Sequence, residues 1–209
     1  MDGAPLHQDA SGLLERAPWV RRHRLSVRDY YRMAEAEILG PDERVELIEG
    51  EIVEMAPIGS GHGGTANRLT RRLVMAVGER GVVAVGNPLR LSDDSEPQPD
   101  LLVLRPRADD YAGAHPTPPD VLLLIEVADS TLRTDRIVKL PLYARHGIPE
   151  VWIVNLPEGI IETYRDPDGE AWRATRRAGR DEVLEPALLP GLRVAVAEVL
   201  GAAPARTPG

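Results

Sequence analysis

Cysteine and phenylalanine are absent from this chain of 209 residues, and aromatic residues make up only 4% of it. Without cysteine the protein has no disulfide, no cysteine-ligated zinc and no cysteine nucleophile. Without phenylalanine the core has to be built mainly from Leu, Val, Ile and Ala. The lack of cysteine also fits a reducing compartment, so we expect a cytoplasmic protein.

Long apolar runs are missing as well. No run approaches the ~18 residues of a membrane helix, and the N-terminal region lacks the apolar segment of a signal peptide. We therefore expect no membrane association. The hydrophobic content of 43% and the charged content of 28% are typical of a globular protein. We expect a single domain over residues 25–200, between disordered tails at residues 1–24 and 201–209.

Positive charge is in deficit, with a net charge of -8. This balance argues against a nucleic-acid partner unless the basic residues cluster locally. Lysine is scarcer still, because Lys139 is the single lysine among 25 basic residues. Arginine cannot imitate a compact ammonium beside a metal-bound water, so this one lysine points to a chemical role. Chance is the alternative interpretation.

Hydrophobic periodicity predicts an α/β protein in which a mixed sheet is flanked by helices. A continuous apolar run over residues 121–127 predicts a central, fully buried strand. Expected helices cover residues 26–37, 65–80, part of 130–146 and 194–200, and Pro141 should kink the third of these or mark its first turn. Expected strands cover residues 45–48, 51–55, 82–85, 89–91, 100–104, 121–127, 151–154, 160–164 and 171–176, the last two joined by a turn at 166–169.

Two carboxylates occupy positions that call for an explanation. Asp100 follows Pro97-Gln98-Pro99 and stands at the entrance of a short apolar strand. For Asp100 alone, a turn or capping role is the simpler interpretation. Glu126 lies near the end of VLLLIEV, a segment that otherwise belongs in the core. Burying an unpaired carboxylate is costly, so Glu126 must be paired, bind a ligand or point outward at the strand end.

Together the two acids suit a divalent cation. Carboxylates on neighbouring strands can share one Mg²⁺ ion, with water and substrate phosphate as the remaining ligands. Such an ion can activate water and stabilise the charge that develops on phosphorus. A nearby ammonium would orient the water or offset that charge. Lys139 lies on the element after the Glu126 strand, where a chain reversal would return it to the strand end.

Three segments resemble the Uma-two family of restriction endonucleases, within the PD-(D/E)XK nuclease superfamily: VELIEGEIVEMAP, PQPDLLVL and IEVADSTLRTDRIVKLPLYARHGIPEVWIVN. The resemblance extends from about Leu25 to Leu200 and is most specific from Glu126 to Val154. It implies a restriction-endonuclease-like mixed β-sheet flanked by helices, with an N-terminal helix and β-hairpin. It also implies an endonuclease that uses Mg²⁺ (or Mn²⁺) to hydrolyse phosphodiester bonds in nucleic acid, with DNA as the expected substrate.

The same resemblance implies the roles of individual residues. Asp100 corresponds to the first acid of the motif and Glu126 to the second, and both are expected to bind the metal. The strict motif then requires lysine two residues later, where this chain has Ala128. In the family the lysine is displaced to the following helix, and Lys139 matches that place.

An acid in the first hairpin is implied as a third metal ligand and catalytic residue. Glu46 matches this position best, and Glu49 is the second candidate. The superfamily also implies a homodimer, because one such site cuts one strand.

Substrate contacts are expected from residues that could bind phosphate. His62 precedes the second predicted helix and could touch the scissile phosphate or support the site. Arg68 and Arg72 on that helix, and Arg136 near Lys139, could offset the acidic average. The alternatives are a solvent-exposed histidine at a helix start and a solvated helix face.

Competing motifs are weak. Residues 59–64 match G-x-G-x-x-G, but the next strand ends without the acid that dinucleotide binding requires. No lysine follows these glycines, so a Walker A loop is excluded as well. The serious alternative is a catalytically inactive nuclease-fold module for binding or assembly, which the acidic balance favours and the Asp100, Glu126 and Lys139 set opposes. Binding of Mg²⁺ or Mn²⁺ separates the two.

Overall fold

Residues 19–201 are described by the computed structural model, and they build a layered α/β structure on one six-stranded sheet. The strand order is β3-β4-β5-β6-β7-β8, and only β5 and β6 run parallel. The expected mixed sheet is therefore confirmed. Its strands are β3 (Val82–Val85), β4 (Leu101–Leu104), β5 (Val121–Ala128), β6 (Glu150–Asn155), β7 (Ile160–Asp168) and β8 (Ala171–Ala178).

Strand β5 is the centre of the sheet, and all eight of its residues are buried. This confirms the strand that the apolar run over residues 121–127 predicts. Because β5 and β6 are parallel, the chain must cross over between them. The crossover consists of α4 (Leu132–Thr134), a π-helical turn (Asp135–Lys139) and α5 (Leu140–Arg145). The segment that carries Lys139 therefore starts beside the carboxyl end of β5.

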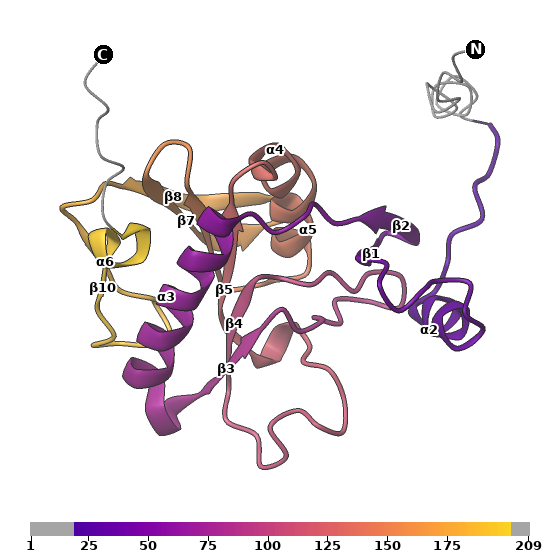
Figure 1. Cartoon of the computed structure of the whole chain (residues 1–209), viewed down its shortest axis with the longest axis horizontal. Coiled ribbons are helices and arrows are strands. Elements are labelled where there is room, and N and C mark those ends of the chain that lie inside the picture. The colour runs from indigo at the N-terminus through magenta and orange to yellow at the C-terminus, as the bar shows by residue number, and fades with distance from the viewer. Residues whose placement is uncertain (1–18, 202–209) are drawn as a thin grey trace.

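Helices cover both faces of the sheet (Figure 1). On one face, α3 (Ser60–Val77) and α6 (Val196–Leu200) pack on the sheet through apolar side chains such as Leu73. On the other face, α5 contributes Tyr143 and its apolar neighbours to a second core. The remaining short elements are 3-10 turns at Gly78–Arg80 and Pro118–Asp120 and a two-stranded pairing of β9 (Val183–Leu184) with β10 (Val194–Ala195).

Helix α2 (Val27–Glu35) and a hairpin stand beside the sheet, at the right of Figure 1. Ser26 begins α2 through a capping box, in which its side chain accepts the Asp29 N–H and the Asp29 carboxylate accepts the Ser26 N–H. The sequence-predicted start of this helix is confirmed.

The hairpin pairs β1 (Val45–Ile48) with β2 (Glu51–Glu54) across Glu49 and Gly50. Both turn residues have positive φ, 48° and 75°, which is the geometry of a tight hairpin turn. An isolated bridge, in which the Glu96 N–H donates to the Leu47 carbonyl at 2.8 Å, ties β1 to the chain before β4. This tie brings β1 to the edge where Asp100 and Glu126 lie.

The crossover contains a π turn before Pro141, and Pro141 lies in the first turn of α5, which is one of the two places that the sequence predicts for it. The Leu140 N–H donates to the Asp135 carbonyl, five residues back. Pro141 has no N–H to continue a regular ladder, so the hydrogen-bond pattern changes at this place. Gly147 ends the segment at φ 71°, as predicted.

Other expectations were wrong in detail. Residues 89–91 form no strand, because Leu89 and Leu91 hydrogen-bond to Pro97 and Ser95 within a loop while their side chains fill the second core. Helix α3 begins at Ser60 rather than near Thr65, although its buried residues, Thr65, Leu69, Leu73 and Val77, all lie beyond the first turn.

The second hairpin also turns later than predicted. Residues 166–168 belong to β7, and the turn lies at Gly169-Glu170.

The predicted tails at residues 1–24 and 201–209 lie largely outside the described residues, because residues 1–18 and 202–209 are not described. Within the described part, Arg22 forms an ion pair with Glu51 at 3.1 Å, and the Leu25 N–H donates to the Gly50 carbonyl. The chain before α2 therefore contacts the hairpin. The limits of the predicted single domain stay a prediction. Among residues 19–201, no helix combines the length and apolarity needed to cross a bilayer.

A test of the β3–β4 pairing uses Gly81. A Cβ at this position would lie 2.5 Å from the Leu104 carbonyl oxygen, so the backbone would have to shift. We expect Gly81→Ala to lower the free energy of unfolding by about 1–3 kcal/mol in urea denaturation. Gly40→Ala is the control, because its Cβ would meet only the Glu43 side chain at 3.7 Å. Equal stability of the two variants would contradict the prediction.

Candidate active site

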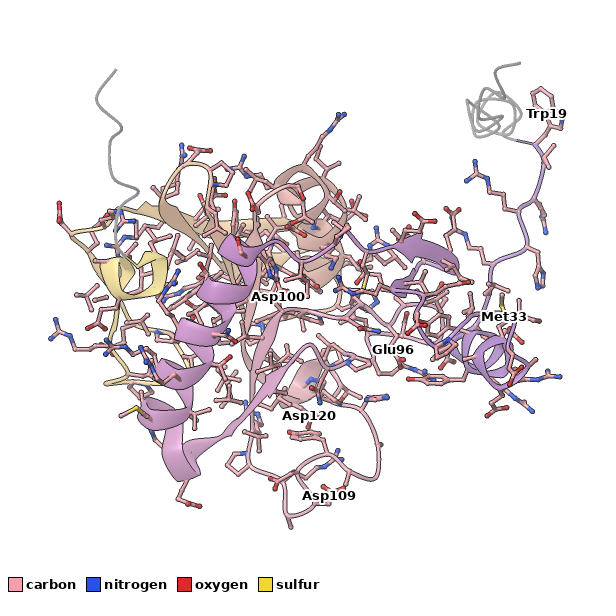
Figure 2. The ribbon with its side chains drawn as sticks, in the orientation of Figure 1. Trp19, Met33, Glu96, Asp100, Asp109 and Asp120 are labelled. Atoms are coloured by element: carbon pink, nitrogen blue, oxygen red, sulfur yellow. The ribbon has the colours of Figure 1, made fainter. Side chains whose placement is uncertain are left out.

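A cavity of about 260 Å³ lies at the carboxyl end of β5, between the start of α3 and the β1–β2 hairpin. Four elements bring the predicted catalytic residues to it: Glu46 from β1, Asp100 from the start of β4, Glu126 from β5 and Lys139 from the π turn. Figure 2 shows Asp100 near the middle of the molecule, beside one end of α3. The tertiary structure therefore assembles these side chains as the sequence predicts.

The pairing of β4 with β5 sets the two motif acids side by side. Leu101 stands opposite Ile125 in the antiparallel register, so Asp100 falls next to Glu126. The Asp100 N–H donates to Glu126 Oε2 at 3.3 Å, and the Val127 N–H donates to Asp100 Oδ2 at 2.7 Å. Backbone donors thus hold both carboxylates in place.

Glu126 is a buried carboxylate, 4% exposed, with charged groups around it. Burial removes it from water and raises its pKa to about 8, and the charges of Asp100 and Asp135 act in the same direction. Lys139 and a hydrogen bond from Tyr143 oppose this shift. A cation in the cavity would therefore stabilise the ionised form of Glu126.

Lys139 lies between two carboxylates. Its Nζ is 3.1 Å from Glu46 Oε2 and 3.5 Å from Glu126 Oε1, and 8% of the side chain is exposed. Burial alone would lower the pKa of Lys139, but the charges of Glu126 and Glu46 outweigh it and raise the pKa above its ordinary value. The ammonium is therefore charged at neutral pH. Glu46 Oε2 also accepts the Gln98 N–H at 3.0 Å.

His62 lies on the first turn of α3 and contacts Asp100 rather than open solvent. Its Nε2 is 3.0 Å from Asp100 Oδ1, while Nδ1 is buried and has no hydrogen-bond partner among residues 19–201. The hydrogen bond to Asp100 is the largest cause of a raised pKa at His62. Its expected contact with substrate stays a prediction.

The three arginines predicted to bind phosphate do not line the cavity. Arg68 donates to the carbonyls of Val199 and Leu200 at the end of α6. Arg72 forms an ion pair with Glu198 at 3.0 Å. Arg136 pairs with Glu162 and Glu158 on the side of β6 and β7. These contacts give each guanidinium a structural role, and their predicted role in substrate binding finds no support in the geometry.

Glu49, the second candidate for a hairpin acid, lies outside the cavity. It occupies the turn and forms an ion pair with Arg145. Asp135 lines the cavity, although its sequence position favoured a helix cap. Its carboxylate accepts the Thr131 hydroxyl at 2.7 Å, and burial raises its pKa.

The sequence interpretation missed two residues of the site. Tyr143 donates its hydroxyl to Glu126 Oε1 at 2.6 Å from a fully buried ring. Its spacing of four residues from Lys139 could have revealed it, because residues at i and i+4 share a helix face. Asp129 lines the cavity beside Gly59 and Gly61. It follows β5 directly, at the end of the strand that carries Glu126.

The cavity has the donor set of a hard cation site. It is lined by six carboxylates against three basic side chains. Mg²⁺ is commonly held by one or two carboxylates with waters in the remaining positions, and the adjacent Asp100 and Glu126 fit this requirement. Within residues 19–201, no three histidine or acidic side chains are arranged to enclose an ion by themselves.

The structure is a mixed sheet with helices on both faces, and two acids and a lysine lie at the carboxyl end of its central strand. The chain belongs to the Uma2 family, which is described as "Putative restriction endonuclease", and the family model matches residues 27–197. This confirms the resemblance noted in the sequence.

A solved structure has the same fold. It is described as a putative nuclease belonging to DUF820 from Anabaena variabilis ATCC 29413, and it is similar with a TM-score of 0.68 and 15% sequence identity. The match covers 84% of this chain and 97% of the other, and at this identity it shows the fold alone. No curated protein matches the chain.

The buried position of Lys139 leads to a stability test. Lys139→Met would leave the buried Glu46 and Glu126 carboxylates without their shared cation. We expect the free energy of unfolding to fall by about 3–5 kcal/mol in urea denaturation. The control Arg145→Met removes an exposed arginine that pairs with Glu49 and Glu170, and should cost below about 1 kcal/mol. If Lys139→Met lowered the free energy of unfolding no more than Arg145→Met does, this would contradict the assignment of the Lys139 ion pairs.

Proposed function

We propose that this protein is a metal-dependent endonuclease that hydrolyses phosphodiester bonds in DNA. The observation that carries the proposal is the convergence of Glu46, Asp100, Glu126 and Lys139 from four elements on one cavity. The family and the fold support a nuclease.

Asp100 and Glu126 would hold Mg²⁺ or Mn²⁺, with Glu46 as a third candidate ligand. A bound ion of this kind activates water and stabilises charge on a phosphoryl group. The acidic lining supports this assignment, because a phosphodiester is repelled by the cavity unless cations balance its carboxylates.

Lys139 contributes positive charge and a donor. An ammonium has three N–H donors, and the contacts with Glu46 and Glu126 occupy two directions. The third remains for the attacking water or for a phosphate oxygen. In this role Lys139 orients the water and offsets the negative charge of the transition state. Glu46 holds the Lys139 ammonium through an ion pair at 3.1 Å.

Asp100 is held by the chain from two directions. The Val127 N–H donates to Oδ2, and His62 lies against Oδ1. We propose that His62 acts on the site through Asp100, by fixing the carboxylate. A homodimer stays a prediction. The reason for predicting it is that one site of this kind cuts one strand, so cleavage of both strands needs a second copy.

The test is nicking of supercoiled plasmid with Mg²⁺ or Mn²⁺. We expect Asp100→Asn, Glu126→Gln and Lys139→Ala each to lower the rate by at least about 100-fold, because each removes a group that stabilises charge in the transition state. Glu49→Gln is the control. Glu49 is an acid in the turn of the β1–β2 hairpin, and it lies outside the cavity. Equal nicking by all variants would place the activity elsewhere.

Metal binding is tested separately by calorimetry. We expect the wild-type protein to bind Mn²⁺ in the millimolar range or better, and Asp100→Asn to lose this binding while Glu49→Gln keeps it. Folding of each variant is checked by circular dichroism. Absence of both cleavage and metal binding in the folded wild-type protein would contradict the proposal and favour a nuclease-fold module that only binds or assembles.

A further inference from the structure

Tyr143, on the buried side of α5, directs its hydroxyl at Glu126. Tyr143 is fully buried, and its ring packs in the core between α5 and the sheet. Its O–H donates to Glu126 Oε1 at 2.6 Å, and among residues 19–201 this is the contact that satisfies the hydroxyl. A phenylalanine would fill the same space, so packing alone does not account for the hydroxyl.

The two oxygens of Glu126 have different partners. Oε1 accepts the Tyr143 hydroxyl and lies 3.5 Å from Lys139 Nζ. Oε2 faces the other way and receives the Asp100 N–H at 3.3 Å. The bond to Tyr143 is therefore the shortest of these three contacts of the Glu126 carboxylate.

Both partners of Glu126 Oε1, Lys139 and Tyr143, lie on one segment of the chain. Lys139 ends the π turn, and Tyr143 follows four residues later on α5, so the two side chains leave the segment on the same side. The chain supplies the charge and the hydrogen bond to Glu126 from a single rigid element.

We propose that Tyr143 is a positioning residue of the active site: its hydroxyl fixes Glu126 so that Oε2 stays on the side of Asp100, and this sets the affinity for a divalent cation. The inference rests on the proposed function, because it assigns Glu126 to a metal. Groups that orient metal-binding carboxylates through hydrogen bonds commonly change metal affinity by 10- to 100-fold when they are removed.

The experiment measures Mn²⁺ affinity by calorimetry for the wild-type protein and Tyr143→Phe. We expect binding to weaken on the order of 10-fold in the variant. Tyr164→Phe is the matched control, because Tyr164 donates at 2.6 Å to Glu162 outside the cavity. It removes a tyrosine–glutamate hydrogen bond of the same length, and it should leave Mn²⁺ affinity unchanged.

Replacing Tyr143 by 4-aminophenylalanine restores an N–H donor at the same place and should recover most of the lost affinity. Plasmid nicking by the variants is expected to follow the same order at fixed Mn²⁺ concentration. Thermal unfolding of each protein separates a loss of positioning from a loss of fold.

The outcomes distinguish this inference from the function on which it rests. Mn²⁺ affinity of Tyr143→Phe equal to that of the wild type would overturn the positioning role and leave the proposed nuclease intact. An equal loss in Tyr164→Phe would also overturn it, because the effect would then be general. If the folded wild-type protein binds no Mn²⁺, both proposals fail together.

Discussion

The burial of Glu126 in the central strand is the constraint on which the site depends. A carboxylate at this place loses its hydration, and the protein has to replace that hydration with specific partners. Lys139 supplies an ammonium, Tyr143 a hydroxyl and Asp100 a backbone N–H. Lys139 and Tyr143 lie in the crossover between β5 and β6, and Asp100 lies at the start of β4. The site therefore exists only when the sheet and this crossover are both folded.

Displacement of the lysine follows from packing at the end of β5. Ala128 lies two residues after Glu126, and it is fully buried against the core that contains Tyr143. A lysine there would have to occupy the space of that core. The π turn instead delivers Lys139 from the crossover helix, and Pro141 accounts for the change in hydrogen bonding that precedes α5. The same charge reaches Glu126 by a route that leaves the core apolar.

Charge is distributed so that the cavity attracts cations and most arginines serve the fold. Arg68 and Arg72 fasten α6 to α3, and Arg136 balances the buried Glu162. The acidic lining of the cavity is therefore not offset by the arginines that the sequence singles out. The chain has a net charge of -8, so bound cations would have to supply the positive charge that the proposed phosphate chemistry needs in this cavity.

The sequence by itself predicted the class of fold, the central strand and four side chains that converge on one cavity. Apolar runs, the Ser26 cap and the turn at Glu49-Gly50 are local signals, and local signals survive in the folded protein. Only the tertiary structure decided which side chains meet. It turned Glu46 inward and Glu49 outward and tied Arg68 to α6. It also brought Tyr143 to Glu126, because such contacts depend on strand register and helix packing, which no single segment encodes.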